Sequence, residues 1–340
     1  MNSSVFAPSH TLNCMRSISF ARASFLPTFR PVRSLLLTVA TASALLISAN
    51  IQPAHAQDYD DSSQGGPQTE AALIGESKDI RPGQPFTVAL RLNMEKGWHV
   101  YWRNPGDSGT PTRITWALPA GFRAGAIQWP VPHRFVDTGM VAYAFENELW
   151  LLTQITPPAN LTPGQSITLA AEADWLICSE QCVPQKKTLG LSLKVSKDAP
   201  IPDPDFKAQF AAARSSIPVP IAQTKVTVRA DRAGAANAKP AGAAVNLRFA
   251  SANKLVLPED RLKQLYFYPA DESALAHPAV QKVVKEGNGY RLPLLTSEYA
   301  SESIKRVRGV LIAPTAKGSA PDSLSRGIWV DVPVTAPTKP

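Results

Sequence analysis

Two cysteines, Cys178 and Cys182, lie four residues apart in the run Trp-Leu-Ile-Cys-Ser-Glu-Gln-Cys-Val-Pro. Such a pair can form a disulfide within a helical turn or a tight hairpin. A structural disulfide stabilises a protein mainly by closing a loop in the unfolded chain, and a five-residue loop gives only about 2 kcal/mol. The same closeness lets one thiol resolve a mixed disulfide formed by the other. The spacing therefore favours redox exchange over a structural bridge.

Two other interpretations of the pair stay open. It could be an inert structural disulfide, or it could bind a metal. Zinc sites usually need four ligands, often as paired Cys-x-x-Cys units, and the sequence has no such unit. Thiolates also suit Cu(I), which Met94, Met140 and His99 could help to bind in a copper-handling protein. No Met-x-Met run occurs, so copper is the weaker alternative and we predict no metal or other bound cofactor.

The amino-terminal residues have the order of a secretion signal. Two arginines precede an apolar stretch at 35–47. The run Ala-His-Ala, which places two small residues two positions apart, then ends at Ala56. This order predicts a signal peptide over residues 1–56 that is cleaved before Gln57. The third cysteine, Cys14, would be removed with it. We therefore expect the mature protein to be exported to a compartment where disulfides form and persist.

Charge and length exclude some classes of protein. Of the 35 lysines and arginines, four lie in residues 1–56, which hold no acidic residue, so the mature chain carries 31 basic and 27 acidic side chains. No basic cluster with interleaved aromatics occurs, which argues against nucleic-acid binding. No apolar run of 18 residues follows Gln57, so we expect no membrane span in the mature chain. A mature length of about 280 residues favours two domains.

The predicted fold class is all-β. Thirty-one prolines separate short apolar runs, and Phe86 to Leu92 alternates as a half-buried strand does. We expect a disordered segment at 57–69 and a first β-sandwich at 70–197. A linker at 198–220 should carry one short helix, which Asp203 would cap. A second β-sandwich at 221–334 and a tail at 335–340 complete the prediction.

The first predicted domain concentrates the tryptophans, with six of the seven between Trp98 and Trp175. In an alternating strand, Trp98 and Trp102 share one face, while His99 and Tyr101 share the other. One face should join the core, and the other could form a wall beside the cysteines. The candidate site-shaping residues are therefore Trp98, His99, Tyr101, Trp102 and Trp175.

The same wall would control the reactivity of the thiols. Apolar cover over the pair would disfavour the thiolate, which is the reactive form. A nearby cation would favour it, and Lys186, Lys187 and His99 are the candidates that the sequence offers.

Three motifs together carry a resemblance to a known family. They are Gly97-Trp98-His99 through Asn104-Pro105-Gly106-Asp107-Ser108-Gly109, the Trp129-Pro130 step, and Asp174-Trp175-Leu176-Ile177-Cys178 through Cys182-Val183-Pro184. Over residues 70–197, and more loosely to 334, the chain resembles the N-terminal periplasmic region of the DsbD/ScsB thiol:disulfide interchange proteins. The resemblance implies an immunoglobulin-like module that takes electrons from a thioredoxin-like domain and passes them to oxidised periplasmic proteins. Cys178 and Cys182 would be its redox-active pair.

The resemblance also implies partners. The sequence has neither a polytopic membrane segment nor a Cys-x-x-Cys thioredoxin-like domain, so we expect a separate membrane electron-transfer protein to supply the electrons. The other partners would be periplasmic thioredoxin-like or disulfide-containing proteins. The predicted function is therefore disulfide reduction or electron shuttling in the periplasm. The main alternative is a non-catalytic periplasmic binding module with an inert disulfide, and the sequence does not decide which cysteine attacks.

Overall fold

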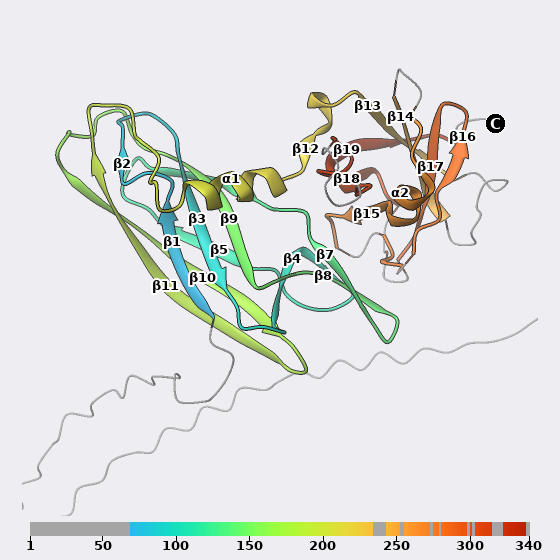
Figure 1. The fold of residues 1–340 in the computed structure, drawn as a ribbon, viewed down its shortest axis with the longest axis horizontal. Coiled ribbons are helices and arrows are strands. Elements are labelled where there is room, and N and C mark those ends of the chain that lie inside the picture. The colour runs from blue at the N-terminus through green and yellow to red at the C-terminus, as the bar shows by residue number, and fades with distance from the viewer. Residues whose placement is uncertain are drawn as a thin grey trace, which may run out of the picture. The chain divides into compact units, whose positions relative to one another are not determined.

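The structure is a computed structural model, and strands dominate it (Figure 1). It describes residues 69–233, 243–251, 255–272, 275–278, 280–297, 300, 303–314 and 322–337. Within these ranges the α-helices are α1 (Lys207–Ser216) and α2 (Glu259–Gln264). The predicted β class is therefore confirmed. The predicted signal peptide and residues 57–68 lie outside the described residues.

Two sheets make up the first part of the described chain. The four-stranded sheet has the order β1 (Glu70–Gly75), β3 (Phe86–Asn93), β9 (Glu148–Thr156) and β6 (Arg123–Gln128). The seven-stranded sheet has the order β2 (Asp79–Ile80), β11 (Cys182–Val195), β10 (Ser166–Cys178), β4 (His99–Gly106), β8 (Met140–Glu146) and β7 (His133–Asp137), and β5 (Arg113–Ala117) also pairs with β10.

One apolar core joins these two sheets. The alternation of β3 directs Val88, Leu90 and Leu92 into it, and β10 contributes Leu169 and other inward side chains. All four of these residues are buried to 1% exposure or less. Side chains at the intervening positions of β10 and β11 face away from this core. The disulfide lies at the end of these two strands, so the core holds the hairpin that carries it.

The later part of the chain forms an eight-stranded sheet around a second core. Its order is β15 (Tyr266–Pro269), β18 (Arg306–Ile312), β19 (Ile328–Thr335), β13 (Val226–Arg232), β14 (Ala243–Ser251), β17 (Gly289–Leu295) and β16 (Val284–Glu286), while β12 (Val219–Pro220) pairs with β19. No sequence pattern predicted β19. This strand extends to Thr335, the first residue of the predicted tail.

The predicted helix forms, but its start differs from the prediction. Phe206 occupies the N-cap position of α1 and makes no capping hydrogen bond through its side chain. Asp203, the predicted cap, lies one turn earlier, where its carboxylate accepts a hydrogen bond from the amide of Asp205. Lys78 forms an ion pair of 3.3 Å with the same carboxylate. The prediction of the cap was wrong because tertiary contacts hold Asp203 in a separate turn.

The end of β4 is tied to the later part of the chain by polar contacts. Asn104 is fully buried, and its side-chain amide donates a hydrogen bond of 2.8 Å to the carbonyl of Pro269. Asp107 pairs with His277 at 3.0 Å. Residues 61–340 form one compact unit. These contacts fix the strand that also carries His99 and Tyr101.

Candidate functional site

The two cysteines face each other across a tight hairpin. Cys178 is the last residue of β10, Cys182 is the first residue of β11, and the register pairs them directly. They form a disulfide with a Cα–Cα distance of 4.1 Å. The connection consists of three residues, closed by a hydrogen bond from the amide of Ser179 to the carbonyl of Gln181. The hairpin thus brings the two sulfurs together.

The two halves of the disulfide differ in exposure. Cys178 is 1% exposed, whereas Cys182 is an exposed residue. Cys178 belongs to a small apolar cluster with Tyr101 and Ala144, against which Phe135, Ala142 and Leu176 pack. This cluster lies apart from the main core, on the other face of the seven-stranded sheet. A partner molecule can therefore reach Cys182 more easily than Cys178.

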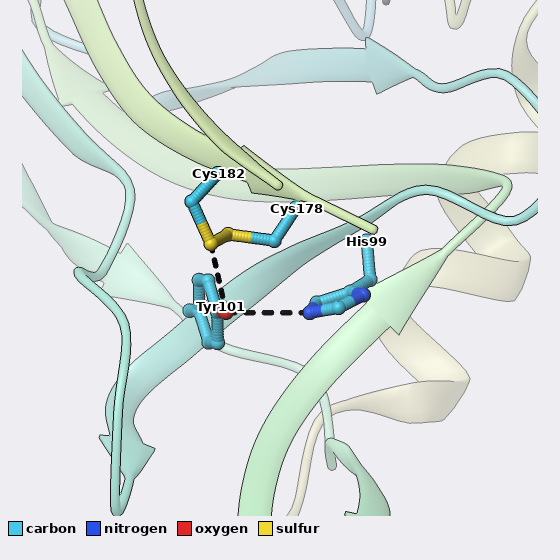
Figure 2. Close-up of a disulfide and its surroundings, with 4 residues drawn as sticks. All are labelled: His99, Tyr101, Cys178 and Cys182. Atoms are coloured by element: carbon cyan, nitrogen blue, oxygen red, sulfur yellow. Dashed lines mark hydrogen bonds between the residues drawn. A yellow bond between two sulfur atoms is a disulfide. The ribbon is translucent and has the colours of Figure 1, made fainter. Parts of the chain in front are cut away.

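A chain of polar contacts leads to the exposed cysteine (Figure 2). The hydroxyl of Tyr101 lies 3.9 Å from Sγ of Cys182, and Nε2 of His99 lies 3.3 Å from the same hydroxyl. A disulfide sulfur carries no hydrogen, so Tyr101 must be the donor to Cys182. When the hydroxyl donates to the sulfur, it can accept from His99 in the tautomer that carries the proton on Nε2. The arrangement directs one O–H group at the sulfur.

The surroundings keep this donor intact. Burial raises the pKa of the Tyr101 hydroxyl, so it stays protonated at neutral pH. His99 packs edge-on against the Tyr101 ring and stacks on Phe135 at a ring distance of 5.5 Å. Strand pairing sets His99 opposite Cys178 on one side and Glu146 on the other. The disulfide therefore lies beside a protonated phenol.

Comparison with known proteins places this hairpin in a family. The family model described as "Thiol:disulfide interchange protein DsbD, N-terminal" matches residues 70–193, which include both cysteines, His99 and Tyr101. Residues 70–193 are therefore similar to the N-terminal domain of DsbD. The resemblance that the sequence motifs predicted is thereby confirmed. No curated protein matched the chain.

Solved structures that are similar to the chain include members of the same group. The N-terminal periplasmic domain of ScsB from Proteus mirabilis shares 16% identity over 76% of this chain and 91% of that one, with a TM-score of 0.49. The reduced DsbD N-terminal domain of Neisseria meningitidis shares 13% identity over 39% of this chain and 90% of that one, with a TM-score of 0.21. The major pilin subunit BcpA of Bacillus cereus shares 12% identity over 80% of this chain and 69% of that one, with a TM-score of 0.23. Likenesses of this degree carry no statement about function.

The predicted site residues fall into two groups in the structure. His99 and Tyr101 join the cysteines at the hairpin. Trp102 and Trp175 lie in the main core, with exposed fractions of 0% and 4%, and Trp98 is half-buried against the same core. The indole of Trp175 donates a hydrogen bond of 2.9 Å to Gln185. The structure thus brings together four of the seven predicted residues.

The lysines do not lie where the sequence analysis expected a cation. The register sets Lys186 opposite Asp174, four residues along each strand from the cysteines, which corresponds to about 13 Å. Lys186 forms an ion pair of 2.7 Å with Glu172. Lys186 lies away from the cysteines because four residues of extended strand separate it from the turn, whereas His99, the third candidate, lies at the site.

Sequence reasoning missed Phe135, Ala144 and Leu176 as neighbours of the disulfide. Phe135 lies on β7, a short strand that directly follows the run Pro130-Val131-Pro132. Such a run gives little sign of a strand, although its pairing with β8 brings Phe135 opposite Ala142. Only strand order, which the sequence does not reveal, places this ring over His99.

None of the helices in the described part of the chain is long and apolar enough to cross a membrane. Among the same residues, no group of three or more His, Cys, Asp and Glu side chains is arranged to hold a metal ion.

His99 should make stability depend on pH. Burial lowers the pKa of His99, and the nearby carboxylate of Glu146 partly opposes this effect. The unfolded chain therefore binds this proton more readily, and the free energy of unfolding should decrease as the pH falls below about 6.5. We expect the His99→Gln variant to lose this part of the pH dependence. Urea denaturation of both proteins at about pH 5 and about pH 7.5 measures it, and equal changes in both proteins would contradict the prediction.

Proposed function

We propose that this protein performs thiol-disulfide exchange through Cys178 and Cys182, as a reductant of oxidised partner proteins. The observation that carries the proposal is the asymmetry of the hairpin disulfide, with Cys182 exposed beside a phenol and Cys178 buried. Exchange needs one accessible sulfur to react with a partner and a second sulfur close enough to resolve the product. The match of residues 70–193 to the DsbD N-terminal family supports the same conclusion.

The exposed cysteine begins the reaction. In the reduced protein, the Cys182 thiolate attacks one sulfur of a partner disulfide, a bond forms between these two sulfurs, and the partner's other sulfur leaves as a thiolate. The Cys178 thiolate then attacks Cys182, which re-forms the intramolecular disulfide and releases the partner's second thiolate. Two electrons pass to the partner. The two protons lost by the cysteines are balanced by the two that the partner thiolates take up.

Tyr101 and His99 assist the first step. When Cys182 becomes a thiolate, the Tyr101 hydroxyl can donate a charge-assisted hydrogen bond to it. His99 donates to the same hydroxyl and so polarises it toward the sulfur. The apolar cluster around Cys178 disfavours charge on that sulfur. The environment therefore selects Cys182 as the attacking group.

The proposal extends to architecture and location. We infer two immunoglobulin-like sandwich domains, at 70–197 and 221–334, joined by the segment 198–220. The second core supports this division, because all of its residues come from 221–334. Family membership supports a periplasmic location after export. The partners would be thioredoxin-like or other disulfide-containing periplasmic proteins. A separate membrane protein would return electrons to the cysteine pair.

The alternative function is a periplasmic binding module with an inert disulfide. One observation favours this alternative. The disulfide joins β10 and β11 at their ends, and these two strands are paired along their whole length, as in a purely structural hairpin. Copper handling, the third candidate, would use thiolates of the reduced pair. These alternatives differ from exchange in the reduction potential that they require.

Equilibrium titration against glutathione and dithiothreitol buffers tests the proposed function. For an exchange protein we expect a reduction potential between roughly −120 and −270 mV, because structural disulfides lie below about −300 mV. Mass spectrometry after thiol trapping measures the reduced fraction. A potential below −300 mV would favour the binding module.

A further inference from the structure

The ring of Tyr101 is covered by a segment of its own chain. Tyr101 projects from the face of the seven-stranded sheet that lies away from the main core, yet it is only 4% exposed. The chain turns after β4 and returns beside it, where Pro111 and Tyr101 form a β-bridge. Residues 109–111 therefore run alongside the tyrosine that contacts the disulfide.

Gly109 lies against this ring. A Cβ atom built on Gly109 would lie 2.4 Å from Cε1, 2.5 Å from Cδ1 and 2.6 Å from Cζ of Tyr101. Real Cβ atoms essentially never lie within 3.0 Å of a heavy atom of a residue that is not their neighbour in the chain. Gly109 also has a φ of +111°, which side-chain-bearing residues rarely adopt. Any side chain at this position must displace the ring or the segment.

Such a displacement would act at the disulfide. Cζ of Tyr101 carries the hydroxyl that lies 3.9 Å from Sγ of Cys182. This distance is near the upper limit for a hydrogen bond to sulfur, so a shift of several tenths of an ångström away from the sulfur would break it.

We infer that Gly109 is a positioning residue for the exchange reaction, because its missing side chain allows the chain to close over Tyr101 and direct the hydroxyl at Cys182. Gly109 touches neither sulfur and acts through the tyrosine. A role in exchange rests on the proposed function. The effect of Gly109 on the reactivity of the Cys182 thiol, through the Tyr101 ring, does not. The inference assigns a role to the last residue of the Asn104–Gly109 motif.

The alkylation of reduced protein by iodoacetamide tests this role, with mass spectrometry to locate the label on Cys182. Loss of a hydrogen bond to the charged thiolate lowers the thiolate fraction at neutral pH about tenfold. The more basic thiolate that remains is about threefold more nucleophilic, so the net loss of rate is about threefold. We therefore expect Tyr101→Phe and Gly109→Ala each to slow alkylation at neutral pH about threefold and to move the pH–rate profile to higher pH. The double variant should be no slower than either single variant.

Gly164→Ala is the matched control. Gly164 has a φ of +92°, and a Cβ there would meet nothing within 4 Å. It lies in the turn before β10, at the opposite end of that strand from Cys178. The control therefore carries similar backbone strain without contact to Tyr101, and we expect its alkylation rate to equal that of the wild type.

Three outcomes would overturn the inference. They are an unchanged rate in Gly109→Ala, an equal loss in Gly164→Ala, and a further threefold loss when Gly109→Ala is added to Tyr101→Phe. If Gly109→Ala does not fold, Gly109→Asn places a Cβ at the same point in a residue that tolerates positive φ better, with Gly164→Asn as its control. The proposed function fails separately, when the disulfide resists reduction by the buffers that reduce exchange proteins, because alkylation does not require exchange with a partner.

Discussion

Cys178→Ser should accumulate a mixed disulfide with its partner, and Cys182→Ser should form almost none. Cys182 is exposed and can attack, whereas Cys178 is 1% exposed within an apolar cluster. Without Cys178, the mixed disulfide on Cys182 lacks its resolving thiol and persists. Without Cys182, the remaining thiol is buried and cannot reach a partner disulfide. Either change should abolish turnover.

Non-reducing electrophoresis of cell extracts after acid quenching and thiol blocking measures the trapped species. The double variant Cys178→Ser/Cys182→Ser is the control for non-specific adducts. Equal trapping by both single variants would contradict the assigned roles, and stronger trapping by Cys182→Ser would reverse them. Absence of any adduct, together with a potential below about −300 mV, would favour the inert-disulfide alternative.

Trp102→Ala should cost about 3–5 kcal/mol of unfolding free energy, because removal of a large buried aromatic side chain leaves a cavity. Trp102 is fully buried and packs edge-on against Tyr143 and Tyr268, with ring distances of 6.2 and 6.3 Å. The side chain lies in the main core, on the opposite face of β4 from Tyr101. We therefore expect alkylation of Cys182 in the folded variant to keep the wild-type rate.

Urea denaturation measures the loss of stability, and the milder Trp102→Phe variant serves where the alanine variant does not fold. Trp98→Ala is the matched comparison, since Trp98 is half-buried on the same face and should cost less. A slower alkylation of Cys182 with little loss of stability would contradict the prediction. It would show that Trp102 shapes the redox site, as the sequence analysis allowed.

The sequence by itself determined the features that depend on local spacing. The four-residue offset of Cys178 and Cys182 was enough to indicate a disulfide, since a connection of three residues leaves the two cysteines within bridging distance. Alternation along β4 likewise separated Trp102 from Tyr101, because successive side chains of a strand point to opposite faces. The β class followed from the same short periodicity.

Only the tertiary structure decided which groups meet the disulfide. Phe135, Ala144 and Gly109 reach the site through strand order and through a return of the chain, neither of which a single sequence reveals. The register also moved Lys186 away from the cysteines and left an uncharged phenol beside Cys182. The physical reason is that pairing between distant strands depends on the packing of whole sheets. Sequence spacing alone cannot rank those pairings.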